Sequence, residues 1–171
     1  MRTDLLIRDA IDAADIATAR VLFEAYRASL DVDLCFQNFA AELESLPGDY
    51  ATPRGCLLIA RRGGVPIGCV ALRPLPSAEG AAEISTAEMK RLYVTPEVRA
   101  LGVGRALATF VIERARTTGY REIKLDTLRS MSAARALYAS LGFSECAPYY
   151  HNPLPGTAYL SLDLGASDAN G

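Results

Sequence analysis

A loop with two glycines, running from Arg99 to Gly104, has the composition of an anion-binding site. It follows the extended run 92–94 and leads into an amphipathic run that begins at Gly104. Glycine permits a backbone with φ > 0 and lets a ligand approach main-chain N–H groups closely. The first turn of a helix leaves several N–H groups unpaired and carries partial positive charge, so a phosphate is attracted there. Arg99 and Arg105 would add full charges at the two rims of this cradle.

The glycines by themselves leave more than one interpretation open. A dinucleotide-binding loop would need a third small residue where Leu107 stands, although Asp126 leaves open an acidic partner for a ribose. A Walker-type loop is excluded because the chain contains no Gly-Lys-Ser or Gly-Lys-Thr. A loop that only begins a helix, with no ligand, also remains open on this pattern.

Length and charge limit the partners of the chain. Its 171 residues fit a single domain, which would bury roughly 70% of the surface that the unfolded chain exposes. The formal net charge of -2 and the pI near 5.5 predict no general attraction to nucleic acid or to anionic membranes. Basic partners are only slightly favoured by this charge.

The cysteines are four widely spaced residues without a Cys-x-x-Cys pair, and the chain has one histidine, so no metal site is expected. We predict that all four are buried, reduced thiols. The N-terminus lacks an apolar stretch behind a basic start, and no apolar run of about 18 residues occurs. A cytoplasmic location is therefore expected.

The first half of the chain predicts a short strand, two helices and a hairpin. They are expected at 5–8, from Asp12 or Asp15 to 30, at 33–46, and at 56–61 with 66–72. Pro47-Gly48 would end the second helix, and Arg62-Gly63-Gly64 has the composition of a hairpin turn.

The second half predicts a long strand, two further helices, a strand between them and a closing strand pair. They are expected at 82–94, 104–119, 122–127, 132–141, and 143–146 with 158–164. If no bulge intervenes, alternate residues of the long strand share one face: Glu88, Lys90, Leu92 and Val94. The connection 148–156, with three prolines, is either a functional or a mobile loop.

This order of elements predicts a mixed α/β fold. After two adjacent strands, strands and helices alternate, which is typical of one curved sheet covered by helices on both faces. The domain is expected over 1–165, followed by a flexible tail over 166–171. The anion cradle lies in the middle of this order.

Two motifs, in order and at matching spacing, resemble one family. The first is Met89-Lys90-Arg91-Leu92-Tyr93-Val94-Thr95-Pro96 running into Arg99-x-x-Gly102-x-Gly104, and the second is Ala136-Leu137-Tyr138-x-x-Leu141-Gly142-Phe143. Together they resemble the GNAT superfamily of acyl-CoA N-acyltransferases, well over 82–143 and in outline elsewhere. The resemblance implies a GNAT fold with a splayed sheet, and transfer of the acetyl group of acetyl-CoA to a primary amine.

The resemblance also implies a site for the cosubstrate acetyl-CoA. In this family backbone N–H groups of the arginine-glycine loop hold the diphosphate of coenzyme A, and the preceding strand pairs with the pantetheine arm. On this chain those positions are Leu92, Tyr93, Val94, Arg99, Ala100, Leu101, Gly102, Val103, Gly104 and Arg105. The Val94 N–H is our candidate donor to the oxyanion that forms during transfer.

Two side chains carry the proposed proton transfers. Tyr138 matches the family tyrosine that donates a proton to the leaving thiolate, although an aromatic residue packed on the sheet is the alternative. Glu88 matches a strand carboxylate that some members use as general base. The rival interpretation of Glu88 is a carboxylate paired to Lys90 or Arg91, and Glu83 is a weaker substitute for it.

A few other positions depart from the family pattern or have more than one possible role. Met131 stands where many relatives carry an asparagine that contacts the cofactor arm. His151 is either a base or a solvated loop residue, and Tyr149 and Tyr150 either line the acceptor pocket or cover the sheet edge. A noncatalytic acyl-CoA-binding module is the second functional hypothesis. No motif identifies the amine acceptor, which is a small molecule or a peptide. Relatives are commonly homodimers, so a homodimer is possible here.

Overall fold

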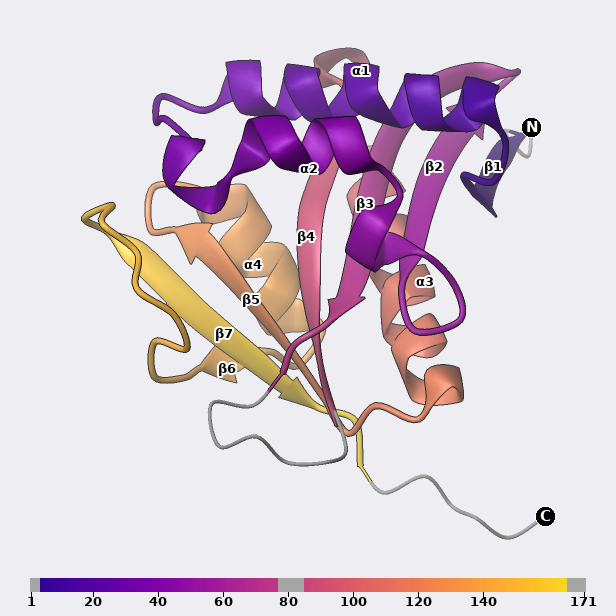
Figure 1. Ribbon diagram of the computed structural model, residues 1–171. Helices are drawn as coiled ribbons and strands as arrows, with labels where there is room; N and C mark the ends of the chain where they lie inside the picture. Colours follow the sequence, from indigo (N-terminus) through magenta and orange to yellow (C-terminus); the bar gives the residue numbers. More distant parts are fainter. Residues whose placement is uncertain (1–3, 77–84, 166–171) are drawn as a thin grey trace, which may run out of the picture.

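The computed structural model describes residues 4–76 and 85–165, in which strands form a seven-stranded sheet with helices on both faces (Figure 1). Its order is β1-β2-β3-β4-β5-β7-β6. The strands are β1 (Leu5–Asp9), β2 (Cys56–Arg62), β3 (Val65–Pro74), β4 (Thr86–Val94), β5 (Glu122–Leu128), β6 (Ser144–Glu145) and β7 (Thr157–Asp163). The helices are α1 (Ala13–Ser29), α2 (Phe39–Ser45), α3 (Val103–Thr118) and α4 (Ser132–Ser140), with 3-10 turns η1 (Cys35–Gln37), η2 (Gly48–Tyr50) and η3 (Pro96–Val98). The predicted mixed α/β architecture is confirmed.

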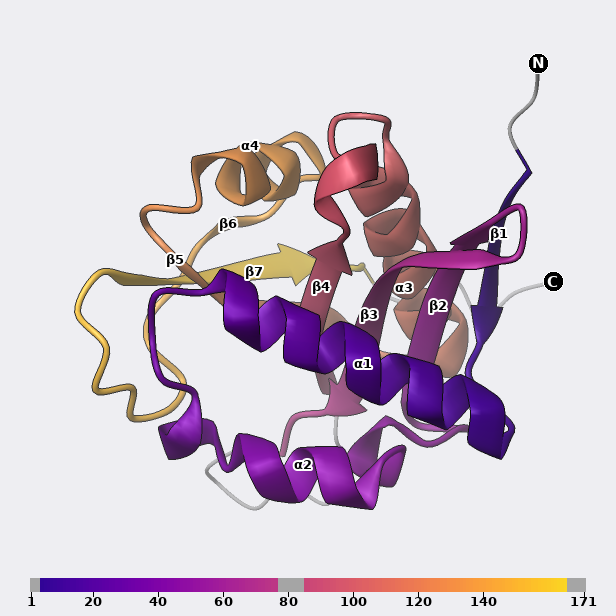
Figure 2. The same cartoon turned by 90° about the horizontal axis from the view of Figure 1, so that it is seen from above.

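Figure 2 shows α1 and α2 on one face of the sheet and α3 and α4 on the other. A hydrophobic core lies on each face. We call the face under α1 and α2 the α1 face, and the face under α3 and α4 the α3 face. Phe23 of α1 packs edge-on against Tyr50 with ring centroids 6.2 Å apart on the α1 face. On the α3 face, Leu107 and Val111 of α3 are completely buried against the strands.

Local sequence signals fix most element ends. The Asp12 side chain accepts a hydrogen bond from the Asp15 N–H at 2.8 Å and so caps α1 as predicted. Gly63 and Gly64 both have positive φ, the conformation that a tight hairpin turn requires. The single helix predicted over 33–46 is wrong, because Asn38 adopts a left-handed conformation with φ 56° and separates η1 from α2.

Strand β4 contains a bulge that the sequence analysis left open. Along the β3–β4 ladder Tyr93 lies opposite Cys69, but Lys90 lies opposite Ala71, so β4 carries an extra residue between the two pairs. Arg91 occupies the bulge with φ 61°. A non-glycine residue in this region costs on the order of 1–3 kcal/mol and persists only where its surroundings enforce it.

The bulge changes which face the second half of β4 presents. Lys90 pairs with Ala71 of the α1-face core, whereas Leu92 and Val94 pack against the α3-face core. Glu88, two residues before Lys90, shares the α1 face with it. The predicted single face for these four alternating residues is therefore wrong.

Strands β4 and β5 are parallel neighbours that separate along their length. They pair only between 86–88 and 122–124, and beyond this point the two strands diverge (Figure 1). The remaining halves, 89–94 of β4 and 125–128 of β5, form the two sides of a split in the sheet. The splayed sheet implied by the family resemblance is present.

Several remaining expectations can be compared with the described residues. All four cysteines are free thiols, but only two match the predicted burial, because Cys35 is exposed and Cys146 is half-buried. Burial raises the pKa of the Cys56 thiol to about 12. None of the helices in the described ranges is both long and apolar enough to cross a membrane. The predicted tail 166–171 and the start of the predicted long strand, 82–84, lie outside the described residues.

Candidate active site

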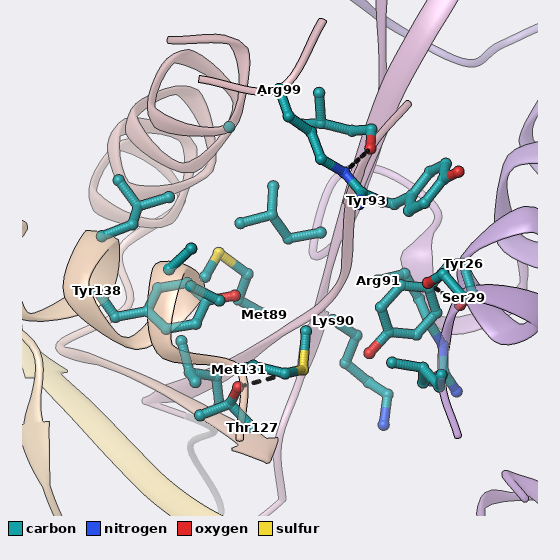
Figure 3. Close-up of a pocket in the computed structure, with 18 of the residues that line it drawn as sticks. Tyr26, Ser29, Met89, Lys90, Arg91, Tyr93, Arg99, Thr127, Met131 and Tyr138 are labelled. Carbon is teal, nitrogen blue, oxygen red and sulfur yellow. Dashed lines mark hydrogen bonds between the residues drawn. The ribbon is translucent and has the colours of Figure 1, made fainter. Parts of the chain in front are cut away.

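A cavity of about 520 Å³ occupies the split between β4 and β5 (Figure 3). Its wall on the α3 face is largely apolar and includes Met89, Leu92 and Leu137. Its wall toward α1 is polar and includes Lys90 and Asp126. The cavity therefore connects the two faces of the sheet and offers different chemistry at its two ends.

The predicted anion cradle adjoins this cavity at the end of β4. Ala100 and Gly102 both adopt left-handed conformations, with φ 64° and 84°, and turn the chain into α3. The first hydrogen bond of this helix runs from the Ala106 N–H to the Gly102 carbonyl oxygen at 3.0 Å. The N–H groups of 103–105 therefore have no carbonyl partner within the helix and remain available to an anion.

Gly104 does not adopt the positive φ that was expected from the sequence, because it already lies inside α3. A Cβ atom at this position would lie 3.6 Å from Leu137 Cδ2 and 3.7 Å from Val94 Cγ2, which is ordinary contact distance. The first turn of α3 therefore lies beside Leu137 and Val94, two residues that line the cavity.

The two rim arginines have partners in the structure. Arg99 donates from Nε to the Val94 carbonyl oxygen at 3.1 Å and lies over the Tyr93 ring (Figure 3). Arg105 donates to Ser140 Oγ at 2.6 Å, which ties α3 to α4. Both residues are exposed at the rim of the cradle, where their charge adds to the partial positive charge of the helix start.

The free edge of β4 faces the split. The Thr95 N–H donates to the Ile67 carbonyl oxygen on β3 at 2.9 Å. Successive residues of a strand direct their N–H groups to opposite sides, so the Val94 N–H points away from β3 and toward the split. The Val94 carbonyl oxygen, which accepts from Arg99, lies on the same side.

Tyr138 reaches the cavity from α4 (Figure 3). It is 7% exposed and packs edge-on against Phe143 with ring centroids 5.7 Å apart. Burial raises the pKa of its phenol well above the usual value. The hydroxyl is therefore protonated at neutral pH and can act as a proton donor, and the ring also fills the packing role that was its alternative.

Glu88 does not line the cavity, although it lies on the neighbouring segment of β4. It is 1% exposed, and its Oε1 accepts from Arg73 at 2.7 Å in an ion pair whose guanidinium is partly exposed. Its Oε2 accepts from the Tyr149 hydroxyl at 2.7 Å. The rival interpretation of Glu88, an ion pair with Lys90 or Arg91, is therefore wrong in its partner, because Glu88 pairs with Arg73. Glu83, the substitute base, lies outside the described residues.

A hydrogen-bonded network missed by the sequence analysis holds the α1 side of the cavity. Arg91, directed there by the bulge, donates to Glu42 Oε2 at 2.8 Å and to Gln37 Oε1 at 2.9 Å. Gln37 donates to the Tyr150 hydroxyl at 3.2 Å, and that hydroxyl donates to Asp126 Oδ2 at 2.9 Å. The network fixes η1, β4 and the loop 148–156 around the acidic side chain of β5.

The loop 148–156 therefore acts through its tyrosines. Tyr149 and Tyr150 each donate to a carboxylate on the α1 face, and their rings pack 5.4 Å apart. His151 is exposed on this loop.

Met131 lines the cavity, and its sulfur accepts a hydrogen bond from the Thr127 hydroxyl at 3.8 Å. A thioether therefore stands where many relatives carry an asparagine side chain. Within 4–76 and 85–165, no cluster of His, Cys, Asp or Glu could hold a metal ion.

Comparison with known proteins agrees with this geometry. Residues 20–143 match the acetyltransferase (GNAT) family. An uncharacterized N-acetyltransferase of Schizosaccharomyces pombe is 38% identical over 151 residues, covering 88% of this chain and 89% of that protein. An acetyltransferase of the GNAT family from Staphylococcus aureus superposes with a TM-score of 0.75 at 18% identity, over 94% of this chain and 99% of that chain. A Salmonella typhimurium protein, solved with its cofactor acetyl-CoA, superposes with a TM-score of 0.68 at 23% identity, over 97% of this chain and 99% of that chain.

Proposed function

The chain belongs to the acetyltransferase (GNAT) family and is an N-acetyltransferase, and on that premise we propose how its own residues carry out the reaction. The observation that carries the proposal is the split between β4 and β5. It places a cavity of about 520 Å³ between the anion cradle and the polar α1 side. An acetyl donor bound on one face of the sheet and an amine acceptor bound on the other can meet within this cavity.

The cradle and the edge of β4 are proposed to hold acetyl-CoA, which supplies the acetyl group as a thioester. The unpaired N–H groups of 103–105 suit the diphosphate, and Arg99 and Arg105 add positive charge at the rim. The backbone groups of Leu92 and Val94, which face the split, suit an extended amide-containing arm that pairs like an added strand. The apolar side chains of Met131 and Leu137 also line the cavity and would pack against the same arm.

Two groups are proposed to act on the atoms that react. A neutral amine attacks the thioester carbonyl, the new C–N bond forms, and the C–S bond breaks with release of the CoA thiolate. The Val94 N–H, directed into the split, stabilises the oxyanion, a contribution of roughly 3–4 kcal/mol for donors of this kind. The Tyr138 hydroxyl gives its proton to the departing sulfur.

The proton lost by the amine has two proposed acceptors. Glu88, expected from the sequence, has both carboxylate oxygens engaged and could act only through the Tyr149 hydroxyl that covers it. Asp126 lines the cavity, and among the described residues only its Oδ2 accepts a hydrogen bond. We assign the direct role to Asp126 and a positioning role to Glu88.

Release of free thiol from acetyl-CoA on addition of amines tests this proposal. We expect release that requires both the protein and an amine and that yields one thiol for each acetylated product. Binding of CoA without turnover on any amine would establish the noncatalytic module instead.

The chain is proposed to form one domain over 1–165, to act in the cytoplasm, where its free thiols are stable, and to assemble as a homodimer. Light scattering tests the assembly, because it distinguishes the mass of one chain from that of two.

A further inference from the structure

Charged side chains surround Lys90 on the α1 face, beside the cavity. They are Glu42, Glu88, Asp126, Arg73 and Arg91. Glu88 pairs with Arg73 at 2.7 Å, and Glu42 pairs with Arg91 at 2.8 Å. Within the described ranges this leaves Lys90 and Asp126 without an ion-pair partner, and both of them line the cavity.

Lys90 is a buried lysine directed at the cavity. The residue is 8% exposed, and its side chain extends from β4 on the side away from Tyr138 (Figure 3). None of the described carboxylates lies within ion-pair distance of its ammonium group. Glu88 and Asp126 attract the ammonium only from beyond that distance. A buried ammonium without a direct ion-pair partner is unfavourable, so an anionic group of a ligand would be stabilised there.

Asp126 offers the opposite charge across the split. It stands on β5, and Tyr150 fixes its carboxylate by donating to Oδ2 at 2.9 Å. Oδ1 accepts no hydrogen bond from the rest of the described chain. Lys90 and Asp126 do not pair with each other, so the cavity presents one fixed negative group and one positive group at separate points of its wall.

We propose that the acceptor is a small amine that also carries a carboxylate, the chemical class of free amino acids. Its amino group would bind Asp126, and its carboxylate would bind Lys90. This assignment rests on the proposed transferase function and adds the substrate class to it. Polyamines and other polycationic acceptors do not fit, because Lys90 and the adjacent Arg91 would repel a second positive group.

The sharpest test compares acceptors that differ only in the carboxylate. Each of the standard amino acids is paired with its own carboxamide, and kcat/KM is measured at saturating acetyl-CoA for both. For the best acceptor we expect the acid to exceed its amide by about 10–100-fold, the range for a hydrogen-bonded contact to a charged group. A dipeptide that begins with the same residue distinguishes a peptide N-terminus from a free amino acid.

Two variants assign the preference to Lys90. Lys90→Met keeps the length of the side chain, and we expect it to raise KM for the acid about 10–100-fold and leave kcat/KM for the amide within about 3-fold. Lys124→Met is the matched control, because Lys124 lies on the α1 side of β5, pairs with Glu122 and does not line the cavity. Unchanged affinity of Lys90→Met for CoA shows that the variant is folded.

The outcomes separate this inference from the function on which it rests. Equal turnover of acids and amides by the wild type, or an equal loss on both in Lys90→Met, overturns the substrate class and leaves the transferase intact. Preference for the dipeptide over the free amino acid overturns it as well. Absence of thiol release with every amine, while acetyl-CoA binds, overturns the transferase proposal itself. If Lys90→Met fails to bind CoA, the same comparison is made with Lys90→Gln.

Discussion

The two ends of the cavity are built in different ways. On the α3 face, the cradle and the edge of β4 offer main-chain N–H groups and an apolar wall, so side-chain identity matters at few positions. On the α1 face, the chemistry depends on Arg91, Lys90, Asp126 and their partners, which come from segments far apart in the sequence. One end of the cavity is therefore set by backbone conformation and the other by side-chain charge.

The largest expected effect comes from placing a negative charge in the backbone-built end. Gly104→Glu directs a carboxylate into the anion cradle, and repulsion at about 4 Å predicts at least ~100-fold weaker CoA binding. Because a Cβ at this position meets only ordinary contacts, the fold is expected to persist. Gly104→Gln has the same size without the charge and should lose no more than about 10-fold. Equal losses in both variants would show that space, and not charge, governs this end.

The next effect separates the two carboxylates of the charged end. Asp126→Asn should lower kcat by about 100-fold, in the range typical of a general base, and leave the melting temperature nearly unchanged. Glu88→Gln should instead lower the free energy of unfolding by roughly 1–3 kcal/mol, because it weakens the buried contacts of Arg73 and Tyr149. Steady-state kinetics and thermal unfolding of both variants check this, and the reverse pattern would return the role of base to Glu88.

A smaller effect is expected where the two ends meet. Tyr138→Phe removes the proton donor but retains the ring that packs on Phe143, so kcat should fall by about 10–100-fold with CoA binding unchanged. Since burial raises the pKa of this phenol, an alkaline decline in kcat between pH 8 and 10 is not expected from Tyr138. A variant as active as the wild type would leave Tyr138 only its packing role.

The smallest effect is a dependence of acceptor affinity on pH. Burial lowers the pKa of Lys90; Arg91 and Arg73 act in the same direction, while Glu88 and Asp126 oppose the shift. Only the protonated ammonium attracts a carboxylate, so KM for an amino acid, expressed as the concentration of its neutral-amine form, should rise as pH increases through this lowered pKa. KM for the matching amide, expressed in the same way, should remain flat. Parallel curves for acid and amide would contradict the role of Lys90.

The difference between the two ends also explains what the sequence could predict. Gly102 needs a positive φ and stands in a recognisable loop, and Asp12 and Gly63-Gly64 mark a helix start and a hairpin in the same local way. Such signals depend on a few neighbouring residues, so the strands, most of the helices and the cradle could be anticipated. The break at Asn38 could also have been found, because asparagine tolerates the left-handed conformation.

The charged end had no comparable signal. Nothing near Arg91 in the sequence indicates that an arginine adopts a left-handed conformation, yet this bulge decides that Glu88 and Lys90 face away from Leu92. The partner of Asp126 is Tyr150, which reaches it only because β7 and its preceding loop return beside β5. Such contacts follow from the assembled sheet and could not be read from spacing.

The most direct test of the account is a calorimetric titration of the purified protein with acetyl-CoA and with free CoA. Backbone donors at 100–105 that hold the diphosphate predict saturable binding of one ligand per chain, with a Kd of about 1–100 μM, and loss of the heat in Gly104→Glu. Absence of heat with both ligands, from protein whose circular dichroism shows the folded α/β structure, would contradict the central claim.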